Sequence, residues 1–367
     1  MTPWDLDLLA APPPFRRISG EGVLLEGEPF RGRSTEVFAW MGVPEGGRPV
    51  PGMVCLHAGA GRAYREWVER WNARGFAAIA PDLGGLGPAG EPLAEGGPAQ
   101  SPENDFDLSI PLRDLWTWHA VAIALRCRAL LASRPGVDPQ RLGVTGISWG
   151  GALACLLAGL EPRFACAATA FGCGFLQHPS GEERSRIFAG MPEADRRRWH
   201  DLFDPARYLP RCRHPILFVS GATEGGFPLD VLKLSYSLVP GPVFLSIRPA
   251  LDHSHEAIWD VPEIGRFADH ALCGGPPLPR LGPIGRARGS LAAPLLEGGP
   301  LRSAHLLFTR DRGRWRERRW QRAPARLAGG RLEADPPPRA AAWYFLAEDR
   351  SGHLASSPHE VSPFPCG

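Results

Sequence analysis

The sequence predicts an α/β fold, in which a mostly parallel sheet is covered by helices on both faces, followed by a smaller β-rich region. Up to Cys273, short apolar runs alternate with helical segments, as they do in strand–helix–strand units. Several runs are apolar throughout, which is typical of strands buried on both faces. After Cys273 the helical period disappears, and turn residues separate short alternating runs. The second region is therefore expected to resemble a small β-sandwich.

The runs define the expected elements in chain order. An antiparallel edge strand is expected at 36–41. Helices are expected where apolar residues recur at helical spacing, as in 64–74, where Trp67 and Trp71 lie on one face and belong to the core. The remaining strands are expected at 52–56, 76–80, 141–145, 164–169, 215–219 and 243–248, and the remaining helices at 112–132, from 149 onward and from about 231 onward.

Changes in composition divide the chain into three parts. Residues 1–45 form an N-terminal extension with the edge strand, 46–273 the α/β catalytic domain, and 280–367 a β-rich accessory domain, after a Gly- and Pro-rich linker. Within the catalytic domain, residues 171–210 break the strand–helix pattern. This insertion is either a lid over the site or a surface excursion. The long Gly- and Pro-rich loop at 84–109 is expected to shape a binding cleft.

A Gly-x-Ser-x-Gly motif identifies the candidate nucleophile. Gly146–Gly151 reads GISWGG and lies between an apolar strand and a helix rich in Ala and Leu. A serine on so sharp a turn needs neighbours without side chains, so that strand and helix can approach each other. The sequence therefore predicts that Ser148 is a catalytic nucleophile.

Two backbone amides are expected to form an oxyanion hole. Trp149 follows the serine at the start of a helix, where the amide and the helix dipole favour negative charge. The second amide is assigned to Gly59, in the small-residue loop His57-Ala58-Gly59-Ala60-Gly61 after the buried strand at 52–56. Considered alone, without the Ser148 motif, this loop is also compatible with an ordinary strand-to-helix turn.

A serine hydroxyl requires a base, which is usually a histidine oriented by a carboxylate. In this topology the acid follows one strand and the histidine follows the next. Glu224 lies just after the strand at 215–219, and Asp230 is the reserve candidate, with helix capping as its expected role. After the last strand, His253 is the preferred base, and His255 is the alternative or a substrate contact.

Composition excludes several other classes of function. The net charge is +2, so nothing favours binding to nucleic acid or to an acidic membrane surface. No segment is long and apolar enough to span a membrane, and the N-terminus lacks the features of a signal peptide. We therefore expect a cytoplasmic protein, although a secreted protein whose signal peptide has been removed would show the same sequence features. The eight cysteines show no metal-binding or redox spacing and are expected to be reduced: Cys55, Cys127, Cys155, Cys166, Cys173, Cys212, Cys273 and Cys366.

The motifs resemble those of the α/β-hydrolases, and more narrowly the acetyl xylan esterase and dienelactone hydrolase-like group. The resemblance covers about residues 36–273 and lies in the loop at His57, the GISWGG motif, the Gly221-Ala222-Thr223-Glu224 turn and the His-x-His at His253 and His255. It implies the α/β-hydrolase fold, serine-esterase chemistry and no metal or organic cofactor. Ala58 and Ser254 stand where the group has glycine, and Glu224 stands where it has aspartate.

The first functional hypothesis is a serine carboxylesterase that hydrolyses small acyl esters, acetyl esters of carbohydrates among them. A serine peptidase of the prolyl oligopeptidase type shares this catalytic domain, but the sequence lacks propeller repeats. The third hypothesis is a binding protein on a hydrolase scaffold, with Arg312–Arg322 as a contact surface. Alternating Arg and Trp in that run is more typical of a solvated strand face. The natural substrate and the oligomeric state cannot be read from the sequence.

Overall fold

The central sheet contains nine strands in the order β1-β2-β3-β5-β4-β6-β7-β8-β9. A computed structural model describes residues 2–59, 61–287 and 289–362; Ala60 of the predicted oxyanion loop and Cys366 lie outside them. Neighbouring strands from β5 to β9 run parallel, and β1, β2 and β3 join antiparallel at the other end. The strands are Phe15–Ser19, Gly22–Phe30, Arg33–Gly42, Val50–Leu56, Ala77–Pro81, Val137–Ile147, Cys166–Ala170, Ile216–Gly221 and Val243–Arg248 for β1 to β9.

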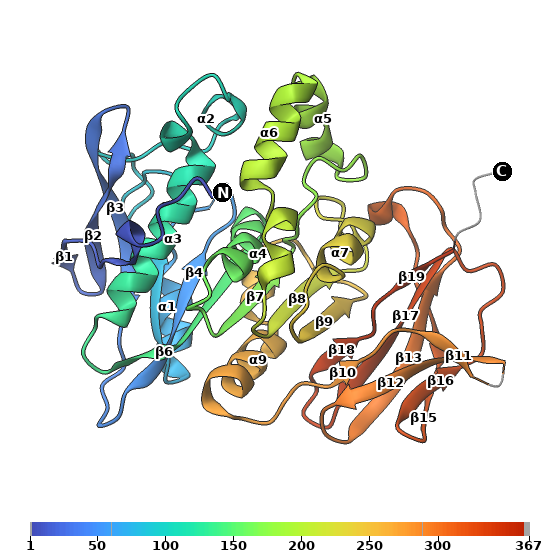
Figure 1. The fold of residues 1–367 in the computed structure, drawn as a ribbon. Helices are drawn as coiled ribbons and strands as arrows, with labels where there is room; N and C mark the ends of the chain where they lie inside the picture. Colours follow the sequence, from blue (N-terminus) through green and yellow to red (C-terminus); the bar gives the residue numbers. More distant parts are fainter. Residues whose placement is uncertain (1, 60, 288, 363–367) are drawn as a thin grey trace.

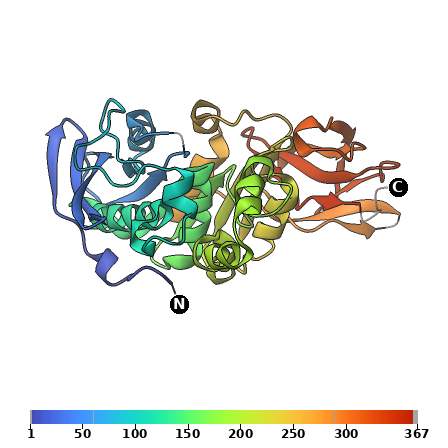
Figure 2. The same cartoon turned by 90° about the horizontal axis from the view of Figure 1, so that it is seen from above.

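Helices cover both faces of this sheet, which confirms the predicted fold class. α1 (Arg65–Ala73) and α9 (Pro262–Cys273) lie behind it in Figure 1, and α3 (Trp116–Ala132) and α4 (Trp149–Leu160) lie in front; Figure 2 shows the same layers from above. α3 and α4 are apolar almost all round and almost wholly buried, as expected for helices enclosed on every side. Trp67 and Trp71 are buried in the core, as predicted.

The insertion forms helices over one end of the sheet. α5 (Glu182–Gly190) and α6 (Glu193–Phe203) are followed by two short 3-10 helices, Pro205–Arg207 and Leu209–Arg211. Figure 1 shows α5 and α6 rising above the sheet, close to the short helix α2 (Pro102–Phe106) in the loop at 84–109. An aromatic cluster joins these parts and consists of Phe106, Phe188, Trp199 and Phe203.

The C-terminal region consists of two antiparallel sheets of five strands each. A second hydrophobic core lies between them and includes Leu306, Leu332 and Phe345. The strands are β10 Arg280–Leu281, β11 Gly285–Ala287, β12 Ser290–Glu297, β13 Leu301–Thr309, β14 Gln321–Pro324, β15 Arg326–Ala328, β16 Arg331–Ala334, β17 Ala342–Asp349, β18 Leu354–Ser356 and β19 Glu360–Val361.

This region packs against the last strand of the central sheet (Figure 1). The Ile247 amide of β9 donates to the Ser356 hydroxyl of β18 at 3.0 Å. The Leu354 amide donates to the buried carboxylate of Glu263 in α9, which also pairs with Arg248 at 2.8 Å. Because these groups are buried and paired, the contact between the two parts is specific.

Two sequence-based expectations about local structure are wrong. The first residues form three strands, β1 to β3, whereas the sequence predicted one. The run Arg312–Arg322 is not a solvated strand face, because it contains a 3-10 helix at Trp315–Glu317 and enters β14 only at its end. Trp315 in this run is buried.

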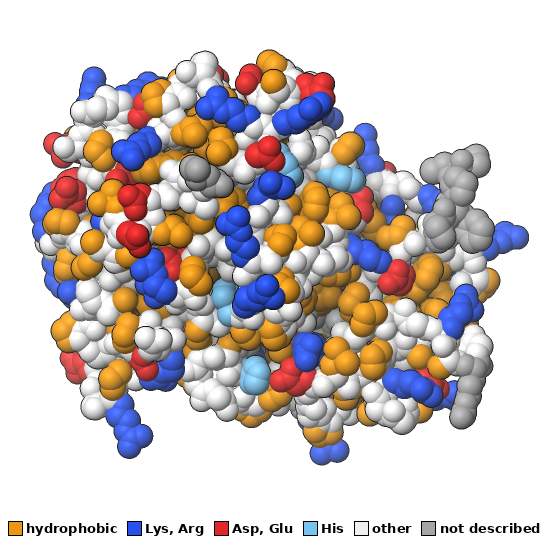
Figure 3. Space-filling view, viewed as in Figure 1, with side chains coloured by type: hydrophobic (Ala, Val, Ile, Leu, Met, Phe, Trp, Pro, Cys, Tyr) orange, Lys and Arg blue, Asp and Glu red, His pale blue; other side chains and the backbone are white. Residues whose placement is uncertain are grey.

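Charged side chains are dispersed over the face of the molecule that Figure 3 shows. On the face in Figure 3, arginine side chains are spread over both parts of the molecule, with apolar atoms between them. Within the described part of the chain, no helix combines the length and apolar character needed to cross a membrane.

Candidate active site

Ser148 lies between β6 and α4 in a strained conformation. Its φ is 57° and its ψ is −117°, a region that residues with a side chain rarely adopt. The Ser148 amide donates to the Ala170 carbonyl at 2.8 Å, which ties the turn to the neighbouring strand β7. The predicted strand–turn–helix context of the GISWGG motif is therefore present.

The glycines of the motif are required by close backbone contacts. A Cβ at Gly146 would lie 2.0 Å from the Gly150 carbonyl oxygen, and a Cβ at Gly150 would lie 2.1 Å from the Leu56 carbonyl oxygen. Gly151 is confined in the same way by the Ala170 carbonyl. Because real Cβ atoms do not approach so closely, only glycine allows the helix to begin directly against β4 and β7.

Glu224 and His253 form a hydrogen-bonded pair at the ends of neighbouring strands. The His253 Nδ1–H donates to Glu224 Oε2 at 2.9 Å. The other ring nitrogen, Nε2, takes no part in this hydrogen bond. The other carboxylate oxygen accepts the Gly226 amide at 2.6 Å and the Phe227 amide at 3.0 Å. The His253 ring stacks on Phe171, with centroids 4.4 Å apart and planes 13° apart.

These contacts keep the Glu224 carboxylate ionised. Burial alone would raise its pKa, but the hydrogen bond and charge of His253, together with the Phe227 and Gly226 amides, lower the pKa below its usual value. The Glu224 side chain is only 5% exposed, whereas that of His253 is 38% exposed. The pair thus joins a buried anion to an imidazole that faces a cavity.

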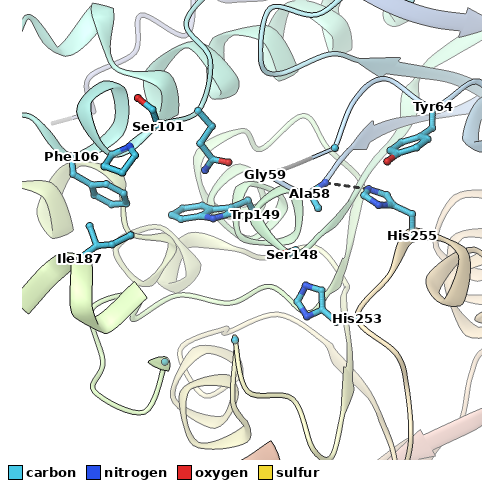
Figure 4. A pocket seen from close by; sticks show the side chains of 15 residues that line it. Ala58, Gly59, Tyr64, Ser101, Phe106, Ser148, Trp149, Ile187, His253 and His255 are labelled. Atoms are coloured by element: carbon cyan, nitrogen blue, oxygen red, sulfur yellow. Dashed lines mark hydrogen bonds between the residues drawn. The ribbon is translucent and has the colours of Figure 1, made fainter. Parts of the chain in front are cut away.

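Ser148 and His253 line the same cavity of about 590 Å³. Figure 4 shows His253 next to Ser148, whereas His255 lies farther away, toward Tyr64. The structure records no hydrogen bond between Ser148 and His253 among the residues it describes. The cavity lies where β4, β6, β8 and β9 end, the position at which open parallel sheets bind ligands.

The two predicted oxyanion residues lie side by side at this cavity. A Cβ at Gly59 would lie 2.8 Å from the Trp149 indole and 2.2 Å from Gln100 Oε1, so a side chain at this position would force these two side chains to move. Trp149 is the first residue of α4, where a helix favours negative charge. Both residues line the cavity.

His255 contacts the oxyanion loop and not the acid. Its Nε2 accepts the Ala58 amide at 3.2 Å, as the dashed line in Figure 4 shows. The ring packs against Tyr64 and Trp259, with centroid distances of 4.5 and 5.9 Å. Burial and the nearby His57 lower the pKa of His255 to about 4, so it stays neutral and retains its acceptor nitrogen at neutral pH.

His57 anchors the other side of the same loop. Its Nδ1–H donates to the Ala58 carbonyl at 2.6 Å, and its Nε2 accepts the Leu83 amide at 2.9 Å. Burial lowers the pKa of His57 to about 4, although the bond to Ala58 opposes this shift. Two neutral histidines therefore hold both polar groups of the Ala58 backbone, immediately before Gly59.

Asp230, the reserve acid, does not meet either histidine of the His-x-His pair. It is the second residue of α7 (Leu229–Tyr236), and its carboxylate accepts the Val231 amide. The N-cap position is occupied by Pro228, so the expected capping role at that position is wrong. Asp230 lines a second cavity instead.

Much of the remaining cavity wall comes from two segments in which the sequence showed no recognisable motif, the loop at 84–109 and the insertion. The loop at 84–109 supplies polar and apolar groups, and the insertion supplies Ile187. Sequence periodicity does not single out any of these residues, because short irregular segments have no repeating face. The additional lining residues are Gly61, Tyr64, Gln100, Ser101, Pro102, Phe106, Gly181, Ile187 and Gly226.

No group of three or more His, Cys, Asp or Glu side chains positioned to hold a metal ion is present in the described ranges. Of the seven cysteines described, all have free thiols, and six are buried. Cys55 and Cys155, for example, lie within β4 and α4, where burial raises the thiol pKa. They pack as small apolar residues, as predicted.

Solved structures with this fold include several hydrolases. An acetyl xylan esterase from Paenibacillus sp. R4 superposes with a TM-score of 0.59 and 22% identity, covering 73% of this chain and 92% of its own. A second acetyl xylan esterase, from Thermoanaerobacterium sp. JW/SL YS485, superposes with a TM-score of 0.54 and 18% identity. The match covers 69% of this chain and 89% of that one. An acylaminoacyl peptidase from Pyrococcus horikoshii superposes with a TM-score of 0.53 and 15% identity. The match covers 70% of this chain and 44% of that one. At such identities the similarity establishes the fold.

A family model extends this result from fold to family. The model described as "Dienelactone hydrolase family" matches residues 37–222, about half of the chain, from β3 through Ser148 to the residues just before Glu224. No curated protein matches the chain. The chain belongs to the dienelactone hydrolase family, and it is a hydrolase with the α/β-hydrolase fold.

Proposed function

We propose that the protein is a serine carboxylesterase that removes small acyl groups, acetyl foremost, from esters that include those of carbohydrates. One observation carries this proposal. Ser148, in a strained turn, faces the same cavity as His253, whose Nδ1–H is bonded to the buried carboxylate of Glu224. A nucleophile, a base and an acid that orients the base are the groups that ester hydrolysis by serine requires.

The proposed reaction proceeds through an acyl-enzyme. Ser148 Oγ attacks the ester carbonyl while His253 Nε2 takes the hydroxyl proton, and the Gly59 and Trp149 amides stabilise the oxyanion. When the C–O bond breaks, His253 returns that proton to the departing alcohol. A water molecule then attacks the acyl-enzyme, gives its proton to His253 and releases the carboxylic acid, while Ser148 regains its proton. Glu224 fixes the tautomer of His253 throughout.

The first prediction concerns Ser148. The Ser148→Ala variant is expected to lose hydrolysis of p-nitrophenyl acetate almost completely, by a factor on the order of 10⁵ or more, because no other residue at the cavity replaces the attacking oxygen. It is also expected to lose covalent labelling by a fluorophosphonate. The measurements are initial rates and intact-protein mass after labelling, with thermal unfolding to show that the variant is folded.

The same experiments separate the other two functions. A wild-type protein that is labelled and cleaves peptide substrates but no acetyl ester would favour a peptidase of the acylaminoacyl peptidase or prolyl oligopeptidase type. A protein that is neither labelled nor active on any ester would favour a binding role on a hydrolase scaffold. Acetylated sugars and a series of acyl chain lengths, compared by kcat/KM, test the carbohydrate and acetyl parts of the proposal.

A further inference from the structure

Gln100 places an amide oxygen in the wall of the candidate active site. The residue belongs to the loop at 84–109 and lines the same cavity as Ser148. Its Oε1 lies against the backbone of Gly59, since a Cβ at Gly59 would be only 2.2 Å from it. The structure records no hydrogen bond to this oxygen from any residue that it describes. The reaction proposed above gives this acceptor no role.

The carboxyl group of Asp105 orients the Gln100 amide. Asp105 is fully buried, and the Thr117 hydroxyl donates to its Oδ1. Burial raises the pKa of Asp105 to about 7, whereas hydrogen bonds with Thr117 and Gln100 lower it. Above this pH the carboxylate can only accept hydrogen bonds, so the NH₂ group of Gln100 faces Asp105 and Oε1 is left to face the cavity.

The helix α2 and its neighbours hold this arrangement in place. Ser101 is the N-cap of α2, and its Oγ accepts the Asn104 amide at 3.2 Å. The Trp199 indole of α6 donates to the Asp105 carbonyl at 2.8 Å. Because the segment after Gln100 is fixed by these bonds, a partner of Oε1 binds with little further loss of conformational entropy.

Gln100 lies on the acyl side of the ester bond. His253 must protonate the departing alcohol, so the alcohol lies next to His253. Figure 4 shows the Trp149 indole on the opposite side of Ser148 from His253. The acyl group therefore projects toward Trp149. Gln100 belongs to this wall, because its Oε1 and the Trp149 indole both lie against Gly59.

The chemistry of this wall fits a short acyl chain with one hydroxyl group. Trp149, Phe106 and Ile187 supply apolar surface for the carbon atoms. Among the described residues that line the cavity, none is Asp or Glu, so a substrate ammonium group would lack a counter-ion. An amide oxygen is a neutral acceptor and pairs well with a neutral hydroxyl donor.

From this geometry we propose that Gln100 is a specificity residue for hydroxyacyl esters, whose acyl hydroxyl donates a hydrogen bond to Gln100 Oε1. The inference rests on the proposed esterase function, because it uses the role of His253 to place the acyl group. It extends the small acyl groups of that proposal from acetyl to glycolyl and its short homologues. The enzyme thus distinguishes a hydroxyacyl ester from the alkyl ester of the same size.

Esters that differ in a single group test this contact. Ethyl glycolate is compared with ethyl propionate, which has a methyl group in place of the hydroxyl, and ethyl 3-hydroxypropionate is compared with ethyl butyrate. Each kcat/KM is divided by the rate constant for hydrolysis of that ester by hydroxide, because a hydroxyl group also activates the carbonyl. At pH 8 the corrected preference for the hydroxy ester is expected to be about fivefold in at least one pair. Ethyl methoxyacetate, which has the oxygen but no donor, is expected to show no preference over ethyl propionate.

Glutamine variants identify the residue responsible. Gln100→Met keeps the length of the side chain and removes the acceptor, so the corrected preference is expected to fall to about one. Gln177→Met is the matched control, because Gln177 is also partly buried but lines a different cavity; it is expected to keep the wild-type preference. Should Gln100→Met fail to fold, Gln100→Asn carries the test, because it withdraws the amide by one methylene group and is expected to lose the preference as well.

Several outcomes would overturn the inference. Equal corrected rates within both pairs would do so. A preference that persists in Gln100→Met, even if all rates fall, would make Gln100 a packing residue beside Gly59. Faster hydrolysis of 2-hydroxyethyl acetate than of propyl acetate, lost in Gln100→Met, would place the acceptor on the alcohol side. If no ester is hydrolysed, the proposed function fails, and saturation-transfer NMR of glycolamide and propionamide with the wild type and Gln100→Met still decides whether Gln100 binds a hydroxyl group.

Discussion

At the scale of single residues, two histidines that are two positions apart in the sequence occupy different environments. His253 is bonded to a carboxylate and faces the cavity, whereas His255 is enclosed by aromatic rings and accepts a backbone amide. The partner of each ring determines what its nitrogens can do. On this difference we propose that His253 is the base and that His255 has a positioning role, and both proposals can be tested.

Replacing Glu224 tests the acid. In Glu224→Gln, the amide group would point an N–H at His253 Nδ1, so the imidazole would adopt the other tautomer and lose its basic Nε2. We expect kcat for p-nitrophenyl acetate to fall by a factor on the order of 10³ to 10⁴, with little change in KM. Asp230→Asn is the control, because Asp230 does not contact the histidine. A loss below tenfold for Glu224→Gln would refute the assignment.

Replacing His255 tests the positioning role. His255→Phe keeps an aromatic ring in contact with Tyr64 and Trp259 but removes the nitrogen that accepts the Ala58 amide. The loop that carries Gly59 therefore loses one of the hydrogen bonds that hold it in place. We expect kcat to fall about tenfold with KM nearly constant, and His255→Gln to recover part of this loss through its amide oxygen. His253→Gln is expected to lose far more. Equal losses for the two positions, or an altered pH profile in His255→Phe, would instead make His255 the base.

At the scale of elements, the loop that carries Glu224 is supported by the C-terminal region. The Trp320 indole N–H donates to the Ala222 carbonyl at 3.1 Å, two residues before Glu224. Glu224, the proposed catalytic acid, is therefore held in part by a segment that lies almost a hundred residues farther along the chain.

A Trp320→Phe variant measures this support. It removes one hydrogen bond and little else, so we expect a loss of about 1 kcal/mol in the free energy of unfolding and a decrease of a few fold in kcat. Trp343→Phe is the matched control, because the Trp343 indole nitrogen is buried without a hydrogen-bond partner in the part of the chain that the structure describes. Similar effects of both substitutions would show that ring packing, and not the bond to Ala222, is responsible.

Local sequence patterns predicted the elements around the site but not the contacts between distant parts. The apolar runs at β4 to β9 and the turn at Ser148 are defined by residues close in sequence, so periodicity and glycine spacing were sufficient. The polar strand β1 carries no such pattern because it lies at the exposed edge of the sheet. The burial of Trp315 and the bond of Trp320 to Ala222 depend on how the C-terminal region packs, and an alternating Arg and Trp run gives no local sign of that.

At the scale of the whole molecule, burial keeps several histidines neutral, and this affects stability. Burial lowers the pKa of His57, His119 and His255 to about 4 and that of His359 to about 3, from an ordinary value of 6.5. Between pH 6.5 and 4 these histidines therefore bind more protons in the unfolded chain than in the folded protein. Asp105, whose pKa burial raises to about 7, acts in the opposite direction, but it is one group against four. Stability rises with pH across this range and is lost as the pH falls.

The corresponding measurement is the Tm as a function of pH. We expect the Tm to fall progressively from pH 6.5 toward pH 4.5, and Glu224 to add to the loss near the lower end, since its own pKa is below the ordinary value when folded. His255→Phe removes one of these groups and is expected to give a shallower dependence than the wild type. A Tm that is constant over this range would show that the folded and unfolded states bind equal numbers of protons, and would contradict the expected effect of these histidines.

The contact between β9 and β18 has a consequence for biosynthesis. β9 ends at Arg248, and β18, the C-terminal strand that packs most extensively beside it, begins only at Leu354. While the ribosome is still making the residues between them, the last strand of the central sheet has an uncovered edge, which is the feature through which nascent chains most readily associate. The hydrolase part is thus exposed to aggregation until β18 has been made, and translation pauses or early termination after Cys273 would prolong that exposure.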